Sequence, residues 1–258
     1  MSPIKEPRFF AAPDPERPFG GPRIARLSEY ESLFDCAAAV RGEASPGYSQ
    51  HPWRPGVPER IHELVPEAKF IYLVGDPVKR VISHYKQAVT EQGEERSIST
   101  ALSDVEEPEQ PFVCPGRYAL QVERYLAVFP RERMLVIDQN DLLNHRRSTL
   151  QLVFAFLGVD ADHWNVEFEL IRNRSSDHRR VSSGLYGCLR DSGLRTAVRR
   201  LPTPMRTLLV APVRHILAQE VDEPLLDAAL RQRLEDHYRP EVERLRAITG
   251  RPFGGWSL

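Results

Sequence analysis

The hydrophobic pattern near the middle of the chain predicts a strand that leads directly into a helix. KFIYLV, residues 69–74, is a short and almost wholly apolar run of β-forming residues. Such a run is typical of a strand that is covered on both faces in a parallel sheet. After the turn at 75–77, apolar residues recur every three to four positions from Val78 to Tyr85. This spacing predicts an amphipathic helix over 78–92.

A second unit of the same kind follows. Residues 116–130 have the pattern of a helix, and RMLVIDQ at 133–139 reads as another buried strand. The apolar pattern then predicts a helix over 141–158 that stops at Gly158, a residue suited to end a helix in the left-handed conformation. Strands that alternate with helices favour an α/β fold with a parallel sheet.

The residues before this core are rich in turn-forming positions. Residues 1–27 contain many Pro and Gly and are expected to be mostly loop. Over 28–40 we expect a short helix, with Ser28 as its N-cap and Glu31 completing a capping box. Another short helix is predicted at 57–66, where the apolar residues fall on one face.

The chain after residue 160 has a different character. It is rich in Arg, and its segments up to about Leu217 are expected to be helical between prolines. A last long helix is predicted up to Gly250, with a break or kink at Pro240. We therefore expect a single domain over 1–258, with a loop-rich segment at 1–56, an α/β core at 57–160 and a mainly helical part at 161–258.

Composition and charge exclude several classes of protein. The 258 residues carry a formal net charge of -1, which gives no bulk attraction to nucleic acid or to a membrane surface. No apolar run approaches the length of about 20 residues that spans a bilayer, and the N-terminus lacks the apolar core of a signal peptide. The three cysteines are far apart, and neither they nor the histidines have the spacing of a metal site. We expect a cytoplasmic protein without a metal.

The turn between the first strand and its helix is a candidate for ligand binding. Asp76 suits the N-cap and Pro77 suits the first helical position. The helix would then begin at the carboxyl end of a buried strand, where free backbone N–H groups and the helix dipole attract anions. Ser83, on the second turn, adds a hydroxyl donor. The plainer alternative is that Asp-Pro simply starts a helix.

Five longer segments of the chain have sequence patterns that can be compared with a known family. They are KEPRFF at 5–10, GEASPGYS at 42–49, IYLVGDPVKRVISHY at 71–85, GRYALQVERYLAVFPRERMLVIDQNDLLNHRRSTLQLVFAFLGV at 116–159 and LEDHYRPEVERLRAITGRPFGGW at 234–256. In this order they resemble the elements of sulfotransferases that use 3′-phosphoadenosine-5′-phosphosulfate (PAPS), and most closely the bacterial and heparan-sulfate-type branch.

The resemblance implies a fold and a set of site residues. The fold would be a three-layer parallel-sheet, P-loop-like sulfotransferase fold, with PAPS as the sulfuryl donor and no metal. The acceptor would be a hydroxyl group of a glycan, a lipid or a small molecule. Glu6 matches the family's general base, and Lys5 would lie near the bridging oxygen. The residues matched to the donor site are Gly75, Asp76, Arg80 and Ser83.

Two further groups of residues are candidates for the same site. The resemblance places Glu43, Ser45 and Tyr48 where they line or brace the acceptor cleft, whereas a turn satisfied by its own side chains is the plainer alternative. The arginines of the basic stretch after residue 170 could meet the donor's 3′-phosphate or an anionic acceptor, or could form a solvated loop. They are Arg172, Arg174, Arg179 and Arg180.

The sequence departs from the family pattern in two places. Gly75 stands where the family usually has an Arg that binds the 3′-phosphate, either because glycine allows close approach to a phosphate or through drift. The chain also has no Pro-Lys-x-Gly-Thr-Thr loop, which in the family holds the 5′-phosphosulfate. We therefore expect the first strand and its loop to be missing, with Met1 an internal methionine of a longer protein and an open edge on the sheet.

Three hypotheses of function remain. The first is a PAPS-dependent sulfotransferase whose sequence lacks its start. The second is a degenerate sulfotransferase-like protein that binds a nucleotide or a partner without catalysis. The third is a nucleic-acid or polyanion binder that uses the arginines from Arg172 to Arg214, although the net charge near zero and the lack of interleaved aromatic and basic residues count against it.

Overall fold

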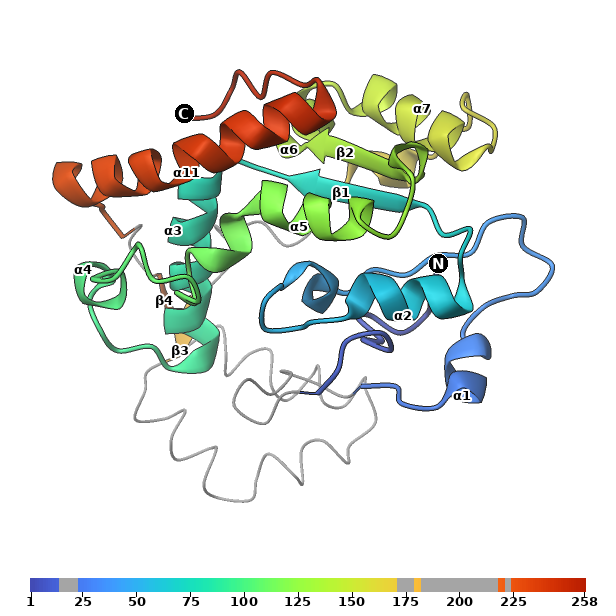
Figure 1. Cartoon of the computed structure of the whole chain (residues 1–258), viewed down its shortest axis with the longest axis horizontal. Coiled ribbons are helices and arrows are strands. Elements are labelled where there is room, and N and C mark those ends of the chain that lie inside the picture. Colours follow the sequence, from blue (N-terminus) through green and yellow to red (C-terminus); the bar gives the residue numbers. More distant parts are fainter. Residues whose placement is uncertain (14–22, 171–178, 182–217, 221–223) are drawn as a thin grey trace.

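The structure is a computed structural model that describes residues 1–13, 23–170, 179–181, 218–220 and 224–258 (Figure 1). The α-helices in this part of the chain are α1 Leu27–Glu31, α2 Val57–Leu64, α3 Pro77–Gln87, α4 Ile98–Ala101, α5 Tyr118–Leu126, α6 Gln139–Asn144, α7 Arg146–Leu157 and α11 Ala228–Thr249. The strands are β1 Phe70–Val74, β2 Met134–Asp138, β3 Arg179–Val181 and β4 Ala218–Glu220. Short 3-10 helices occupy Pro46–Ser49, Cys114–Gly116, Arg131–Arg133 and Val166–Glu169, and a π-helical turn at Ala88–Gln92 extends α3.

The centre of the fold is the parallel pair β1 and β2, which confirms the α/β class and both predicted strands. In their register Phe70 lies opposite Met134 and Val74 opposite Asp138, so both strands end at the same level. α3 begins just after β1 and α6 begins just after β2. The carboxyl ends of two strands and the amino ends of two helices therefore meet at one edge of the sheet, where ligands bind in open α/β sheets.

One face of this sheet is covered by helices. Phe70, Tyr72 and Val74 alternate on the covered face of β1 and pack in a core with residues of α5 and α11. α11, red in Figure 1, lies alongside α5. The ring of Phe70 lies 4.8 Å from that of Tyr125, and the ring of Tyr72 lies 5.9 Å from that of Tyr118, both edge to face. Aromatic packing of this kind fixes α5 against β1.

The other face and one edge of β1 are open in the described part of the chain. Ile71 and Leu73 are 43% and 46% exposed. Among the described strands, β1 pairs with β2 alone, so the edge of β1 away from β2 has no partner strand there. A cavity of about 460 Å³ runs along consecutive residues of β1 from Lys69 to Leu73. The open edge expected from the sequence is therefore present among these residues.

Several helix predictions are confirmed and others are corrected. α3 starts at Pro77 with Asp76 as its N-cap, and α7 stops at Gly158, whose φ of 79° is left-handed. The predicted capping box is wrong, because α1 has Arg26 as its N-cap, makes no side-chain cap bond and lasts only five residues. The helix predicted over 141–158 is interrupted at His145, where the backbone leaves the helical region between α6 and α7.

Most of the segments predicted to be helical up to about Leu217 lie outside the described residues, and the predicted last helix is present as α11. Of the break or kink predicted at Pro240, the break is wrong, since α11 continues through that residue. Tyr238 and Val242 on either side of Pro240 are buried, and this packing offsets the cost of one lost backbone hydrogen bond. The antiparallel pair β3 and β4 was not predicted, because three-residue strands leave too short a pattern to detect.

Candidate functional site

The first turn of α3 is saturated by its own cap. Asp76 accepts hydrogen bonds through Oδ1 from the amides of Val78 at 2.9 Å and Lys79 at 3.1 Å. The Arg80 amide donates to the Asp76 carbonyl oxygen at 2.9 Å, and Pro77 has no N–H group. The expectation that these amides are free for an anion is therefore wrong, because the buried carboxylate of Asp76 takes them. An anion beside the first turn of α3 would therefore need donors other than the amides of Val78, Lys79 and Arg80.

Arg80 is the side chain best suited to that role. Its Nη1 atom is buried and has no hydrogen-bond partner among the described residues. Its neighbour His84 also has a buried, unpartnered nitrogen, Nδ1, and the pKa of His84 is lowered to about 4, first by burial and then by the Arg80 charge. His84 is thus neutral near pH 7 and offers no counter-charge. Arg80 is half-buried and lines the 460 Å³ cavity, so its unpartnered Nη1 atom is a candidate contact for an anion.

The other matched residues of this edge have different surroundings. Ser83 is exposed, three residues after Arg80 on α3. A Cβ atom on Gly75 would lie 2.6 Å from Oε1 of Gln139, the first residue of α6. Gly75 therefore makes room for the Gln139 side chain, a role that sequence reasoning missed because the two residues are far apart in the chain. The φ of Gly75 does not require glycine.

The C-terminal tail crosses the ends of both strands. The Ser257 amide donates to Oδ2 of Asp76 at 2.9 Å, and Nε1 of Trp256 donates to Oδ1 of Asp138 at 3.2 Å. Asp76 and Asp138 are the N-caps of the helices that follow β1 and β2, so the tail ties the two caps together. The sequence shows Asp138 at the end of one predicted strand and Asp76 two residues beyond the end of the other. The hydrogen bonds from the tail to these two residues depend on long-range packing and have no local signal.

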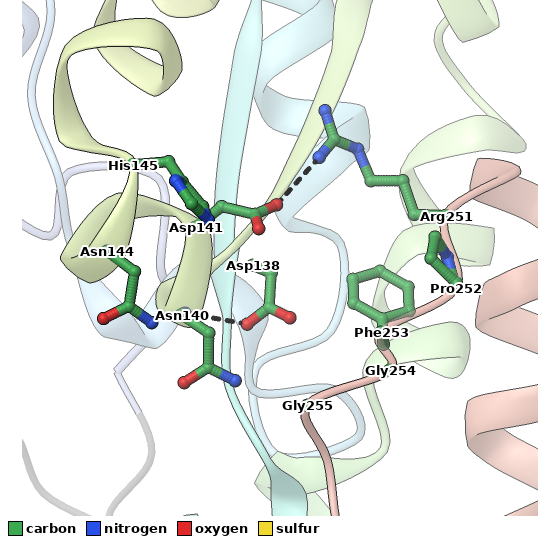
Figure 2. Close-up of a pocket in the computed structure, with 10 residues that line it drawn as sticks. All are labelled: Asp138, Asn140, Asp141, Asn144, His145, Arg251, Pro252, Phe253, Gly254 and Gly255. Carbon is green, nitrogen blue, oxygen red and sulfur yellow. Dashed lines mark hydrogen bonds and ion pairs between the residues drawn. The ribbon is translucent and has the colours of Figure 1, made fainter.

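Beside the tail lies a smaller, polar cavity of about 240 Å³, shown in Figure 2. Asp141 and Arg251 form an ion pair of 3.4 Å across it, and the Asn140 amide donates to Asp138. The side chains and backbone that line it are those of Asp138, Asn140, Asp141, Asn144, His145, Arg251, Pro252, Phe253, Gly254 and Gly255. Asp141 and Arg251 are thus paired with each other, whereas Asp138 accepts from the Asn140 amide and the Trp256 indole.

The segment that carries Glu6 is strained. Glu6 and Arg8 both have φ of 56°, in the left-handed region that residues other than glycine rarely adopt. Their side chains form an ion pair, with Nη2 of Arg8 2.5 Å from Oε2 of Glu6. Lys5 is 81% exposed at its side chain and places Nζ 3.9 Å from Oε1 of Glu6. Strain of this kind is concentrated at functional sites, and the roles of Lys5 and Glu6 in such a site stay predictions.

GEASPGYS forms a hydrogen-bonded cluster around Glu43. The carboxylate accepts from the Tyr48 hydroxyl at 2.6 Å, the Ser45 hydroxyl at 2.9 Å and the Tyr30 hydroxyl at 3.4 Å. Burial raises the pKa of Glu43, and the three hydroxyl donors lower it in part. Burial and the charge of Glu43 together raise the pKa values of Tyr30 and Tyr48 well above their ordinary range, so both phenols remain protonated.

The 460 Å³ cavity joins some of these groups and leaves others out. Arg80 lines it together with Glu43, Ser45 and Tyr48, so one candidate from the donor side and three from the acceptor side share this space. The remaining candidates do not line it; they are Lys5, Glu6, Gly75, Asp76 and Ser83. Glu6 is connected to the cavity wall through the Arg8 amide, which donates to Ser45 at 3.0 Å.

The predicted basic residues lie largely outside the structure's described part. Arg172 and Arg174 fall outside it, and Arg179 and Arg180 belong to β3 without a described side chain. Within the described ranges, no three His, Cys, Asp or Glu side chains are grouped so as to hold a metal ion. Nor does any described helix combine the length and apolar character needed to cross a membrane.

The chain is similar to several known proteins. Residues 2–163 match the model of the sulfotransferase family. The bifunctional heparan sulfate N-deacetylase/N-sulfotransferase 4 of Mus musculus is 31% identical over 118 residues, which are 42% of this chain and 13% of that protein. The heparan sulfate glucosamine 3-O-sulfotransferase 3B1 of Mus musculus is 28% identical over 207 residues, which are 76% of this chain and 46% of that protein. The chain thus spans less than half the length of these two relatives.

A solved structure extends the similarity to the whole chain. The crystal structure of a sulfotransferase from Alicyclobacillus acidocaldarius matches with a TM-score of 0.66 and 26% sequence identity, and covers 100% of this chain and 87% of that one. The family match includes every candidate residue from Lys5 to Ser83. The chain belongs to the sulfotransferase family.

Proposed function

We propose that the protein transfers a sulfuryl group from PAPS to a hydroxyl group of an acceptor. The observation that carries this proposal is the match of residues 2–163 to the sulfotransferase family. The two mouse relatives are, by name, heparan sulfate sulfotransferases, and on that basis a hydroxyl-bearing glycan is the first acceptor class to test, ahead of a lipid or a small metabolite.

Arg80 supports the donor half of the proposal. Its buried, unpartnered guanidinium nitrogen fits an anionic group such as a ribose phosphate. Ser83 is exposed three residues further along α3 and offers a hydroxyl donor to the same group. Asp76 and Gly75 contribute by shape, because Asp76 caps the helix and Gly75 leaves room for Gln139. When bound, PAPS supplies the sulfuryl group and a bisphosphate leaving group.

Glu6 is the proposed general base. Arg8 engages its Oε2, whereas its Oε1 lies 3.9 Å from the Lys5 ammonium. The Oε1 atom takes the proton of the acceptor hydroxyl while the new S–O bond forms and the S–O bond to the donor phosphate breaks. Lys5, with its exposed flexible side chain, neutralises charge near the bridging oxygen.

A degenerate protein that binds nucleotide without catalysis is the second candidate. The feature that favours it is the absence of a Pro-Lys-x-Gly-Thr-Thr loop from the sequence, because that loop carries donors for the charge on the leaving phosphate in the resembled family. The polyanion-binding alternative depends on arginines that lie outside the described residues or, like Arg179 and Arg180, have no described side chain. A cytoplasmic location and the absence of a metal remain predictions.

The test is a transfer assay with ³⁵S-labelled PAPS and a panel of glycan, lipid and small hydroxyl acceptors. We expect label in the acceptor and release of adenosine 3′,5′-bisphosphate. Glu6→Gln should lower the rate by roughly 10²- to 10⁴-fold, while Glu63→Gln, an exposed carboxylate on α2, should not. Bisphosphate binding without transfer to any acceptor would favour the degenerate protein, and equal rates for the two variants would reject Glu6 as the base.

A further inference from the structure

We propose that Glu43 is a positioning residue that holds the strained segment Lys5–Phe10, and with it Glu6, in its working conformation. The inference rests on the proposed role of Glu6 and concerns a different residue, which makes no contact with Glu6 itself. We call the hydrogen-bonded group Glu43, Ser45 and Tyr48 the carboxylate clamp.

The clamp works because a carboxylate can only accept hydrogen bonds. Glu43 therefore forces the hydroxyl hydrogens of Ser45 and Tyr48 toward itself, at 2.9 Å and 2.6 Å. The oxygen lone pairs of these two hydroxyls then point elsewhere. They accept from the backbone amide of Arg8 at 3.0 Å and from that of Phe10 at 3.3 Å. One half-buried carboxylate thus sets the direction of both bonds to the segment.

The two amides are placed where the segment needs support. Glu6 and Arg8 both have φ of 56°, and a left-handed conformation is unfavourable for residues other than glycine. Such strain persists only when the surroundings over-determine the backbone. The bond to the Arg8 amide fixes one of the strained residues directly, and the bond to the Phe10 amide fixes the segment two residues further on.

Aromatic packing also holds the segment Lys5–Phe10, and this packing does not depend on the charge of Glu43. Phe9 stacks on Tyr30 with ring centroids 4.4 Å apart and planes 11° apart. Phe10 lies edge to face against Tyr30 at 5.3 Å and against Tyr48 at 5.8 Å. This packing survives when Glu43 is replaced by the isosteric glutamine. Glu43→Gln therefore tests the direction of the hydrogen bonds without emptying the core.

The experiment measures hydrogen exchange at single amides in the full chain together with transfer kinetics. In Glu43→Gln, the Arg8 and Phe10 amides should exchange roughly tenfold faster, because a glutamine amide group can donate to a hydroxyl and turn it around. The kcat should fall at least tenfold, and the KM for PAPS should stay within about twofold, because Glu43 lines the same cavity as Arg80 but is not among the residues proposed to bind the donor. Glu59→Gln, which alters an exposed ion pair with Arg124, is the matched control and should change none of these values.

A second pair of variants separates the clamp from general loosening. Tyr48→Phe removes the strongest bond to Glu43 and the acceptor of the Phe10 amide, whereas Tyr30→Phe removes only the 3.4 Å bond. We expect the first to have the larger effect on exchange and on kcat. Exchange in Glu43→Gln equal to that in Glu59→Gln, or faster exchange with unchanged kcat, would overturn the proposal. If no acceptor receives sulfate from the wild-type protein, the proposed function fails, and exchange alone decides whether the clamp exists.

Discussion

The contact between Gly75 and Gln139 allows a steric role of Gly75 to be tested separately from a role in donor binding. A Cβ atom on Gly75 would lie 2.6 Å from Oε1 of Gln139, which is inside contact distance, so Gly75→Ala forces the Gln139 side chain out of its rotamer. That displacement costs about 0.5–1.5 kcal/mol. The substitution also lowers the conformational entropy of the unfolded chain, which stabilises the folded protein by about 0.4–1 kcal/mol. The two effects offset, so we expect Gly75→Ala to be within about 1 kcal/mol of neutral.

The steric effect becomes visible in a double-mutant cycle. In the Gln139→Ala background the obstacle is gone, and Gly75→Ala should be stabilising by about 0.4–1 kcal/mol. The coupling energy between the two positions, measured by urea unfolding, should therefore be about 0.5–1.5 kcal/mol. A coupling energy below about 0.3 kcal/mol, the level expected of independent sites, would refute the view that Gly75 makes room for Gln139.

The same pair tests the donor site. Gly75→Arg combined with Gln139→Ala restores the residue that the sulfotransferase resemblance expects at this position and clears the space for it. A guanidinium that contacts a phosphate contributes about 1.5–3 kcal/mol, so the double variant should bind adenosine 3′,5′-bisphosphate roughly tenfold to a hundredfold more tightly than Gln139→Ala alone. Calorimetric titration measures the difference. Unchanged affinity would contradict a phosphate position beside residue 75 but would leave the steric result intact.

Three further predictions concern stability and are checked by urea unfolding. The pKa of His84 in the folded state is about 4, below its ordinary value. The free energy of unfolding should therefore decrease by up to about 3 kcal/mol as the pH falls from 6.5 to 4, because the unfolded state takes up a proton that the folded state does not. His84→Gln should flatten this pH dependence. Tyr238→Phe removes the bond to the Val113 carbonyl at 2.6 Å and should cost about 1–3 kcal/mol. Trp256→Phe removes the indole donor to Asp138 and should cost a similar amount of stability. For each of these three variants, an unfolding profile equal to that of the wild type would contradict the role given to that residue.

The elements that could be predicted from the sequence are those fixed by local pattern. β1 and β2 are continuous apolar runs, and the start of α3 at Asp76-Pro77 is set by residues next to each other in the chain. The stop of α7 at Gly158 is local in the same sense. In contrast, the continuation of α11 through Pro240 depends on packing against distant elements, and the short pair β3 and β4 has almost no local pattern.

The candidate site residues could be named from the sequence only where a segment resembles a motif of the sulfotransferase family. The position of Arg80 on α3 agrees with the predicted helix, and the site roles of Lys5, Glu6 and Arg80 stay predictions. Glu43 was named as a residue that lines or braces the cleft, but the bond from the Arg8 amide to Ser45 and the crossing of the strand ends by Ser257 could not be predicted, because both are contacts between segments far apart in sequence. The saturation of the α3 amides by Asp76 was missed for another reason: a good N-cap and an open anion site compete for the same N–H groups.

The central claim is that Arg80, rather than the backbone of α3, receives the phosphate of a nucleotide at the carboxyl end of β1. Calorimetric titration of adenosine 3′,5′-bisphosphate into the wild-type protein, Arg80→Ala and Lys79→Ala tests it most directly, because Lys79 is an exposed cation one residue away. We predict binding by the wild type, an affinity at least about tenfold weaker in Arg80→Ala and little change in Lys79→Ala. Equal affinities for the wild type and Arg80→Ala, or no binding by the wild type, would contradict the claim.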